Sequence, residues 1–361
     1  MPALSRKIEA GRLRAFCQAI LHRAGLRSRD AALFADSLVT ANLRGIDSHG
    51  VARLSHYLHR LELGSINPRP RLRFERLAPA CGVVEGDHGP GQLVMHRAAL
   101  EAIKLARASG AGWVTVRDSS HCGALDYFGR AIARAGMIGL VFTHVDSMVL
   151  PFGARQRFCG TNPLCIAVPA GRGRDLCLDM ATSVVAWNVV ANAAFAGERI
   201  PRGWAVDQTG RGTADPRRAA ALYPVGTYKG SGLGLMIEVL CALLTGAPYG
   251  PDVPRMYEQL DQPRRLGGLV GAIDLQRFVP RREFEARLRE LLARWNALKP
   301  RARGGRVLYP GQREMECEAR RRREGIPLPR ELIAELTQWC RERGLNADLG
   351  AATRRRQVHK R

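Results

Sequence analysis

Residues 113–145 read WVTVRDSSHCGALDYFGRAIARAGMIGLVFTHV, and this stretch decides the fold. It opens with a run rich in β-branched residues, 113–117, and closes with a second apolar run, 137–145. Between them, residues 124–136 repeat apolar groups at helical spacing. A strand, a helix and a second strand in succession predict a mixed or parallel sheet covered by helices.

The same alternation continues on both sides of this stretch. Further β-like runs occupy 81–86, 164–170 and 176–180, and helical patterns occupy 29–44, 48–64, 92–109, 183–197, 233–246 and 281 to about 343. We therefore expect an α/β protein. Its expected parts are an N-terminal helical part (1–72), a central α/β domain (73–254), a C-terminal helical part that packs back on the first (255–345) and a basic, disordered tail (346–361).

The composition is that of a globular protein with a very basic surface. Of the 361 residues, 46% are hydrophobic and 25% are charged, and the net charge is +23. The nine cysteines include no CxxC pair, which argues against a disulfide framework and against a structural zinc site. No apolar run is long enough to span a membrane and no signal peptide is recognisable, so we expect a cytoplasmic protein without a membrane partner. The positive charge favours anionic ligands, but no nucleic-acid motif accompanies it, so nucleic acid is not an expected partner.

The first candidate site is the segment 48–57. Ser48 is placed to cap a helix, and His49, Arg53 and Tyr57 follow it on one stripe of that helix. The free N–H groups of the helix start and the Arg53 guanidinium could together hold a small carboxylate. The alternative is an ordinary capped helix with a polar outer stripe.

The second candidate site is the segment 118–123, DSSHCG. His121 follows the predicted strand 113–117 in a loop of small residues, where it can face a cleft. An imidazole titrates near neutral pH, so it could take a proton from an alcohol. The alternative is a loop histidine bonded to backbone. A zinc site made from His49, His121 and Cys122 has no recognisable ligand spacing, so we expect no metal.

Four further segments lie at predicted junctions. GTNP (160–163) and DMATS (179–183) each follow or precede a strand and are rich in polar groups. YKGSGLG (228–234) precedes an apolar helix, where its glycines and lysine could approach a phosphate. YPGQ (309–312) is typical of a tight turn. Turn and capping chemistry explains each of these segments equally well when it is taken alone.

Taken together, the motifs resemble one family. They are RGIDSHGVARLSHY, DSSHCGALDYF, LPFGARQRFCGTNPLCIAVP, LDMATSVVAW, IPRGWAVDQTGRGTADP and YKGSGLGLMIEVL. In this order they are similar to the motif series of the malate/L-lactate dehydrogenase family, which is distinct from the Rossmann-fold lactate and malate dehydrogenases. The resemblance implies a non-Rossmann mixed sheet decorated with helices, with a helical subdomain built from both chain ends. It also implies a homodimer that oxidises a small 2-hydroxy acid to its 2-oxo acid with NAD, NADP being the alternative.

The resemblance also implies roles for individual residues. His121 matches the family's acid/base histidine, and Ser48, His49 and Arg53 match the pocket for substrate and nicotinamide, with Arg53 as the carboxylate clamp. Tyr57 and Arg265 are further expected substrate contacts. The expected cofactor contacts are Thr161, Asn162, Asp179, Met180, Ala181, Lys229, Gly230, Gly311, Gln312 and Arg313.

Within the family, segments such as MVLPFGA, MYEQLDQPRRLGGL, WNALKP and VLYPGQ are most similar to the branch that oxidises ureidoglycolate to oxalurate in purine catabolism. Six positions depart from that branch: Val145 stands for a serine, Ala154 for a glycine, Asn188-Val189 for Gly-Lys, Ser231 for a tyrosine and Arg265 for an asparagine. Val145 and Arg265 suggest that the group beyond the substrate carboxylate is not a neutral ureido group, or is held differently. The alternatives are a malate, lactate or sulfolactate type of dehydrogenase, or an impaired relative that acts as a binding protein.

Overall fold

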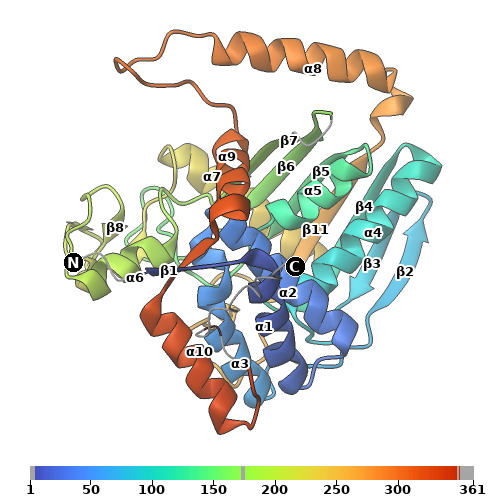
Figure 1. Cartoon of the computed structure of the whole chain (residues 1–361). Helices are drawn as coiled ribbons and strands as arrows, with labels where there is room; N and C mark the ends of the chain where they lie inside the picture. Colours follow the sequence, from blue (N-terminus) through green and yellow to red (C-terminus); the bar gives the residue numbers. More distant parts are fainter. Residues whose placement is uncertain (1–4, 172–174, 348, 350–361) are drawn as a thin grey trace, which may run out of the picture.

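The computed structural model describes residues 5–171, 175–347 and 349. Its centre is a seven-stranded sheet in the order β2-β3-β4-β11-β5-β6-β7, in which only β3 and β4 run parallel (Figure 1). The strands are β2 (Arg73–Ala78), β3 (Cys81–Glu85), β4 (Ala111–Ser119), β5 (Ile138–Thr143), β6 (Leu164–Pro169), β7 (Asp175–Met180) and β11 (Leu266–Ile273). The predicted mixed α/β class is confirmed.

Helices cover both faces of this sheet. On one face α4 (Gly91–Ser109) and α5 (Asp126–Arg134) bury alternate strand residues such as Val114 and Val141. On the other face α7 (Tyr228–Cys241) packs on Phe142 and its neighbours. Since successive side chains of a strand point to opposite faces, the alternation of β5 accounts for both contacts.

The two chain ends build one helical layer beside the sheet (Figure 1). It contains α1 (Ala10–Arg23), α2 (Ser28–Leu43), α3 (Leu54–Glu62) and α10 (Arg330–Glu342), and β1 (Ser5–Ile8) pairs with β12 (Ile326–Pro329). One apolar core joins residues from both ends, among them Phe34 and Leu336. Burial of this shared core holds the termini together.

The remaining elements are small or peripheral. A three-stranded sheet, in the order β10-β8-β9, lies near α6. The elements are α6 (Trp187–Ala196), β8 (Ala205–Val206), β9 (Gly212–Thr213), β10 (Ala221–Leu222), α8 (Arg281–Asn296), α9 (Gln312–Glu324) and 3-10 turns at 47–49, 51–53, 216–218, 243–245, 250–252 and 275–277.

The residues of the predicted C-terminal helical part, 255–345, do not form one structural unit. Its residues 266–273 form β11 in the middle of the central sheet, and α8 lies at the far side of that sheet from the terminal helices. Glycine has a low strand propensity, so the glycine-rich sequence LGGLVGAI does not predict the strand that it forms. We propose that the α/β domain continues through β11. Of the predicted tail, residue 348 and residues 350–361 lie outside the described residues.

Strand direction brings the candidate segments to one edge of the sheet. β4 and β5 are both antiparallel to β11, so their carboxyl ends and the start of β11 meet there. The order of β5, β6 and β7 brings the end of β7 to the same edge. Loops that begin at residues 120, 144 and 181 therefore face one region.

Candidate active site

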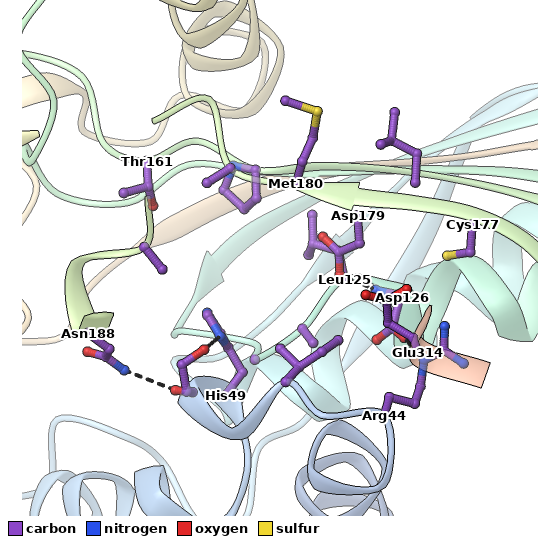
Figure 2. A pocket seen from close by; sticks show the side chains of 18 of the residues that line it. Arg44, His49, Leu125, Asp126, Thr161, Cys177, Asp179, Met180, Asn188 and Glu314 are labelled. Atoms are coloured by element: carbon purple, nitrogen blue, oxygen red, sulfur yellow. Dashed lines mark hydrogen bonds and ion pairs between the residues drawn. The ribbon is translucent and has the colours of Figure 1, made fainter. Parts of the chain in front are cut away.

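A cavity of about 660 Å³ opens at this edge, between the sheet and the helical layer. Figure 2 shows that it has two separated ends: His49 and Asn188 lie at one, and Arg44, Asp126 and Glu314 at the other. A pocket of this volume is typical of small-molecule sites. Segments that are far apart in the sequence line this cavity. They include 44–53, 121–126, 177–181, 186–188, 256–257 and 308–314.

His121 lines the first end and is held from behind by a buried tyrosine. The Tyr57 hydroxyl lies 2.6 Å from His121 Nδ1, and Gln92 Nε2 donates to that hydroxyl at 3.0 Å. Tyr57 is only 1% exposed, so this support is rigid and dry. The backbone N–H of Gly123 also approaches Nδ1, at 3.4 Å. A base at Nε2 requires the tautomer with the proton on Nδ1, which is then donated to the Tyr57 oxygen and leaves the lone pair of Nε2 for an incoming hydroxyl.

Both pocket histidines are neutral near neutral pH. The His49 and His121 rings stack with centroids 5.7 Å apart. Burial, followed by the neighbouring His49 and Arg53, holds the pKa of His121 well below its usual value. Burial and the Arg53 charge lower the pKa of His49 to about 4. A neutral imidazole is the form that a general base requires.

Arg53 carries a positive charge into the same end of the cavity. It is 9% exposed, its Nε donates to Ser48 O at 2.9 Å, and its Nη1 donates to the Tyr257 hydroxyl at 2.5 Å. The Nη2 group forms no such bond within the described chain. A guanidinium held in this way can offer its remaining N–H groups to a carboxylate.

The second end of the cavity is built on a buried cluster of charges. Arg44 forms an ion pair with Asp126, and the backbone N–H of Asp126 donates to Asp179 Oδ2 at 2.8 Å. Burial, with the neighbouring Asp126 carboxylate, raises the pKa of Asp179 to about 7. Glu318 adds a second carboxylate partner for Arg44. Carboxylates in such a position can accept hydrogen bonds from hydroxyl groups of a ligand.

Most of the residues singled out in the sequence meet in this cavity. Those that line it are Ser48, His49, Arg53, His121, Thr161, Asp179, Met180, Ala181, Gly311 and Arg313. Tyr57 lies one layer behind, against His121. The described residues hold no cluster of side chains suited to a metal ion.

Five predicted contacts lie elsewhere. Arg265 is exposed and donates to Asp118 at 3.0 Å beside a separate, shallower pocket. Both arginines precede β11, Arg265 has a left-handed backbone conformation (φ 50°), and it is the neighbouring Arg264 that points inward, to Asp146. The others that do not line the cavity are Asn162, which is buried against Glu238, Lys229 and Gly230 in the first turn of α7, and Gln312.

The Ser48 capping role is also wrong. Ser48 lies within a 3-10 turn, Asp47–His49, and α3 begins only at Leu54. Its hydroxyl lies 2.8 Å from His49 Nδ1, so it orients that ring and leaves the helix start uncapped. The carboxylate site therefore depends on side chains, and the N–H groups of a helix end play no part in it.

Several pocket residues were not predicted as site residues, and two of them, Asn188 and Tyr257, form hydrogen bonds around Arg53. Asn188 Nδ2 donates to Ser48 O at 3.0 Å (Figure 2), and the Tyr257 hydroxyl donates to Asn188 Oδ1 at 3.0 Å. Asn188 stands out in the sequence only as a departure from the resembling branch. No local pattern connects either residue with Arg53, because folding alone brings these segments together.

Comparison with known proteins agrees with this architecture. Residues 8–337 match the family model described as malate/L-lactate dehydrogenase. The ureidoglycolate dehydrogenase (NAD(+)) of Escherichia coli (strain K12) is 37% identical over 319 residues, 88% of this chain and 90% of that protein. The malate dehydrogenase of Pyrococcus abyssi is 33% identical, over 94% of this chain and 95% of its own. The solved sulfolactate dehydrogenase of Methanocaldococcus jannaschii has a TM-score of 0.87 at 34% identity, over 95% of this chain and 98% of that chain. The chain therefore belongs to the malate/L-lactate dehydrogenase family.

Proposed function

We propose that this protein is an oxidoreductase that converts a small 2-hydroxy acid to the 2-oxo acid with a nicotinamide cofactor. The observation that carries the proposal is the pairing of the neutral His121 imidazole with the Arg53 guanidinium at one end of a single cavity. A base for the hydroxyl and a cation for the carboxylate are the two groups that such a substrate requires.

The residues at the second end fit a dinucleotide cofactor. The cavity continues past Asp179 to Gly311 and Arg313. Within the described chain the Asp126 carboxylate, which is buried, accepts no hydrogen bond beyond its ion pair with Arg44. Ribose hydroxyls are donors that suit such acceptors. We propose NAD as the cofactor, because a buried carboxylate cluster disfavours an additional phosphate, with NADP as the alternative.

In the proposed mechanism, Arg53 holds the substrate carboxylate and presents the hydroxyl to His121 Nε2. A nicotinamide bound in this cavity would supply the acceptor for the hydride that leaves the carbon bearing the hydroxyl. His121 takes the hydroxyl proton, and the Tyr57–Gln92 pair behind it keeps the ring in the orientation that this transfer needs. The buried site strengthens the attraction between Arg53 and the oxygen as negative charge develops there.

We propose ureidoglycolate as the substrate, because the first end of the cavity suits an acid with a single negative charge. Among the described lining residues near His121, Arg53 is the one arginine or lysine. Arg264 does not line the cavity and pairs with Asp146 through Nη2, while its buried Nε and Nη1 have no partner in the described chain. Apolar side chains, including Val145, Met148 and Met256, share the wall with polar ones such as Asn188 and Tyr257. Malate and sulfolactate carry a second negative charge that no second lining cation of the described chain would meet at this end. Arg265 points away, so it gives no reason to expect a group other than a neutral ureido group, whereas Val145, the second departure, lines the cavity.

We therefore expect kcat/KM for ureidoglycolate to exceed that for malate and sulfolactate by about a hundredfold or more, since an unpaired charge in an apolar pocket costs several kcal/mol. The measurement is NADH formation with a panel that also includes lactate, which separates the effect of charge from that of the ureido group. A preference for malate or sulfolactate would overturn the substrate assignment. Absence of turnover with every acid would instead support the alternative, a binding protein derived from the fold.

We also propose that the protein is a cytoplasmic homodimer formed through α7. Residues Tyr228–Thr245 are long and apolar enough to span a membrane, and 39% of them are buried in the chain. Exposed apolar side chains along this segment are Tyr228, Leu233, Leu235, Met236, Val239, Leu243 and Leu244. A face of this kind marks an interface, and the buried Glu238 on its inner side suits a core helix. Light scattering should therefore report twice the chain mass of 39.7 kDa; a monomer at micromolar concentration would contradict this.

A further inference from the structure

The Arg53 side chain is one member of a closed ring of hydrogen bonds. Arg53 Nε and Asn188 Nδ2 both donate to Ser48 O, at 2.9 and 3.0 Å. Arg53 Nη1 donates to the Tyr257 hydroxyl, which in turn donates to Asn188 Oδ1 at 3.0 Å. The ring joins the 48–53 turns, the first turn of α6 and the loop after the 250–252 turn.

The ring engages both sides of the Asn188 amide and both the donor and the acceptor role of the Tyr257 hydroxyl. The amide of Asn188 has one donor and one acceptor side, and both are engaged. The Tyr257 hydroxyl accepts from Arg53 and donates to Asn188, and the Arg53 guanidinium lies 5.7 Å from the centre of the Tyr257 ring. Such a contact with an aromatic ring is attractive for a cation.

The loop that carries Tyr257 is itself held by two buried arginines. Arg60 donates to several backbone oxygens of this loop, including those of Met256 and Gln259. Asp146, paired with Arg264, accepts from the backbone N–H of Met256 at 3.2 Å. Tyr257 is thus fixed from its own side of the pocket, which allows it to restrain Arg53.

We propose that Asn188 and Tyr257 are positioning residues for the substrate carboxylate. Ser48 O engages Nε and the Tyr257 hydroxyl engages one N–H of Nη1, and Asn188 holds both of these partners in place. The Nη1–Nη2 edge of Arg53 is thereby left as the edge that the substrate meets. A guanidinium with one free edge binds a carboxylate in one orientation, and this directs the hydroxyl to His121. The role is a property of this chain, because the resembling branch has Gly-Lys at 188–189, and Val189 here points to solvent.

The test rests on the proposed function and begins with a 2-hydroxy acid that the unaltered protein oxidises. Asn188→Ala and Tyr257→Phe should each raise KM for that acid about tenfold, since each removes a hydrogen bond that orients a charged group. They should leave kcat within about threefold and the Kd of NADH within about twofold. Asn188→Asp should raise KM more than Asn188→Ala does, because its carboxylate competes with the substrate for Arg53.

The hydrogen-bonded ring also predicts how weakly the double variant binds the acid. Because both residues act through Arg53, the Asn188→Ala/Tyr257→Phe protein should bind the acid about as weakly as either single variant, far from the product of the two effects. Val189→Ala, an exposed neighbour on α6, is the matched control and should behave like the unaltered protein. Titration with oxamate in the presence of NADH measures the same loss without turnover.

The outcomes separate this inference from the function on which it rests. If the unaltered protein oxidises no 2-hydroxy acid and binds no oxamate, the proposed function fails. If it is active and the KM values of the single variants stay within about twofold, the positioning role alone is wrong. Fully multiplicative effects, or equal losses in acid and NADH affinity, also overturn it, because they indicate general loosening of the fold.

Discussion

Replacing His121 by alanine should lower kcat by about a thousandfold while NADH still binds. Removing a general base typically costs a factor of about 10² to 10⁴. His121 lines the cavity and its Nδ1 is held by Tyr57, which leaves Nε2 as the nitrogen proposed to take the proton. Initial rates with the preferred acid, together with fluorescence titration of NADH, measure the two effects separately.

The pH dependence of the unaltered protein follows from the same side chain. The neutral imidazole is the active form for oxidation, and burial, with the neighbouring His49 and Arg53, holds the pKa of His121 well below its usual value. Lowering the pKa of a base keeps it active at lower pH. The kcat/KM for oxidation should therefore show no inflection between about pH 5.5 and 8, where an ordinary histidine would titrate.

The control for this prediction is His59→Ala, an exposed histidine on α3 that should leave the rate unchanged. If His121→Ala kept more than about a tenth of the activity, the proton would go elsewhere and the base would be misassigned. An inflection near the usual histidine pKa, present in the unaltered protein, would contradict the buried, cation-flanked environment described for the ring.

Replacing Arg53 by alanine should lower kcat/KM for the 2-hydroxy acid by about a thousandfold. Two charge-assisted hydrogen bonds to a carboxylate contribute about 1.5 to 3 kcal/mol each, and each factor of ten corresponds to about 1.4 kcal/mol. Arg53→Lys should recover little of this loss. An ammonium keeps the charge but lacks the planar edge, and it cannot hold the bonds to Ser48 and Tyr257 together.

Arg265→Ala is the matched control, because the sequence pointed to both arginines as substrate contacts and the structure separates them. Arg265 pairs with Asp118 on the exposed side, so its removal should change kcat/KM by less than about twofold. A larger effect at Arg265 than at Arg53 would place the substrate at a different pocket. Measuring kcat/KM of both variants with the same acid, over the same series of cofactor concentrations, shows whether the substrate binds at Arg53 or at Arg265.

Secondary structure was predictable wherever the local pattern was strong. The strands at 113–117 and 164–170 and the helices at 29–44 and 92–109 appear within a few residues of their predicted bounds. The strand β11 was missed because three of its residues are glycines. Those glycines are required by packing: a Cβ at Gly267 would lie 1.8 Å from Cys241 O, and one at Gly271 would lie 2.5 Å from the Trp113 ring. Tertiary contacts override the low strand propensity of glycine here.

Some site residues were likewise predictable from local sequence, and others were placed only by the fold. His49, Arg53 and His121 could be found because each lies in a short motif whose chemistry is readable locally, and the cavity does contain them. Arg265 lies outside the cavity because the loop before β11 places it, with a left-handed backbone conformation, on the exposed side, and no local pattern shows which of two adjacent arginines points inward.

By itself, then, the sequence determined the α/β class, the family and the base and cation of the proposed chemistry. These depend on periodicity and on short ordered motifs. Only the tertiary structure decided that Tyr57 stands behind His121, that Asn188 and Tyr257 complete the ring around Arg53, and that Arg265 lies outside. Such contacts join residues far apart in the chain, and they follow from strand order and side-chain direction, which no local pattern encodes.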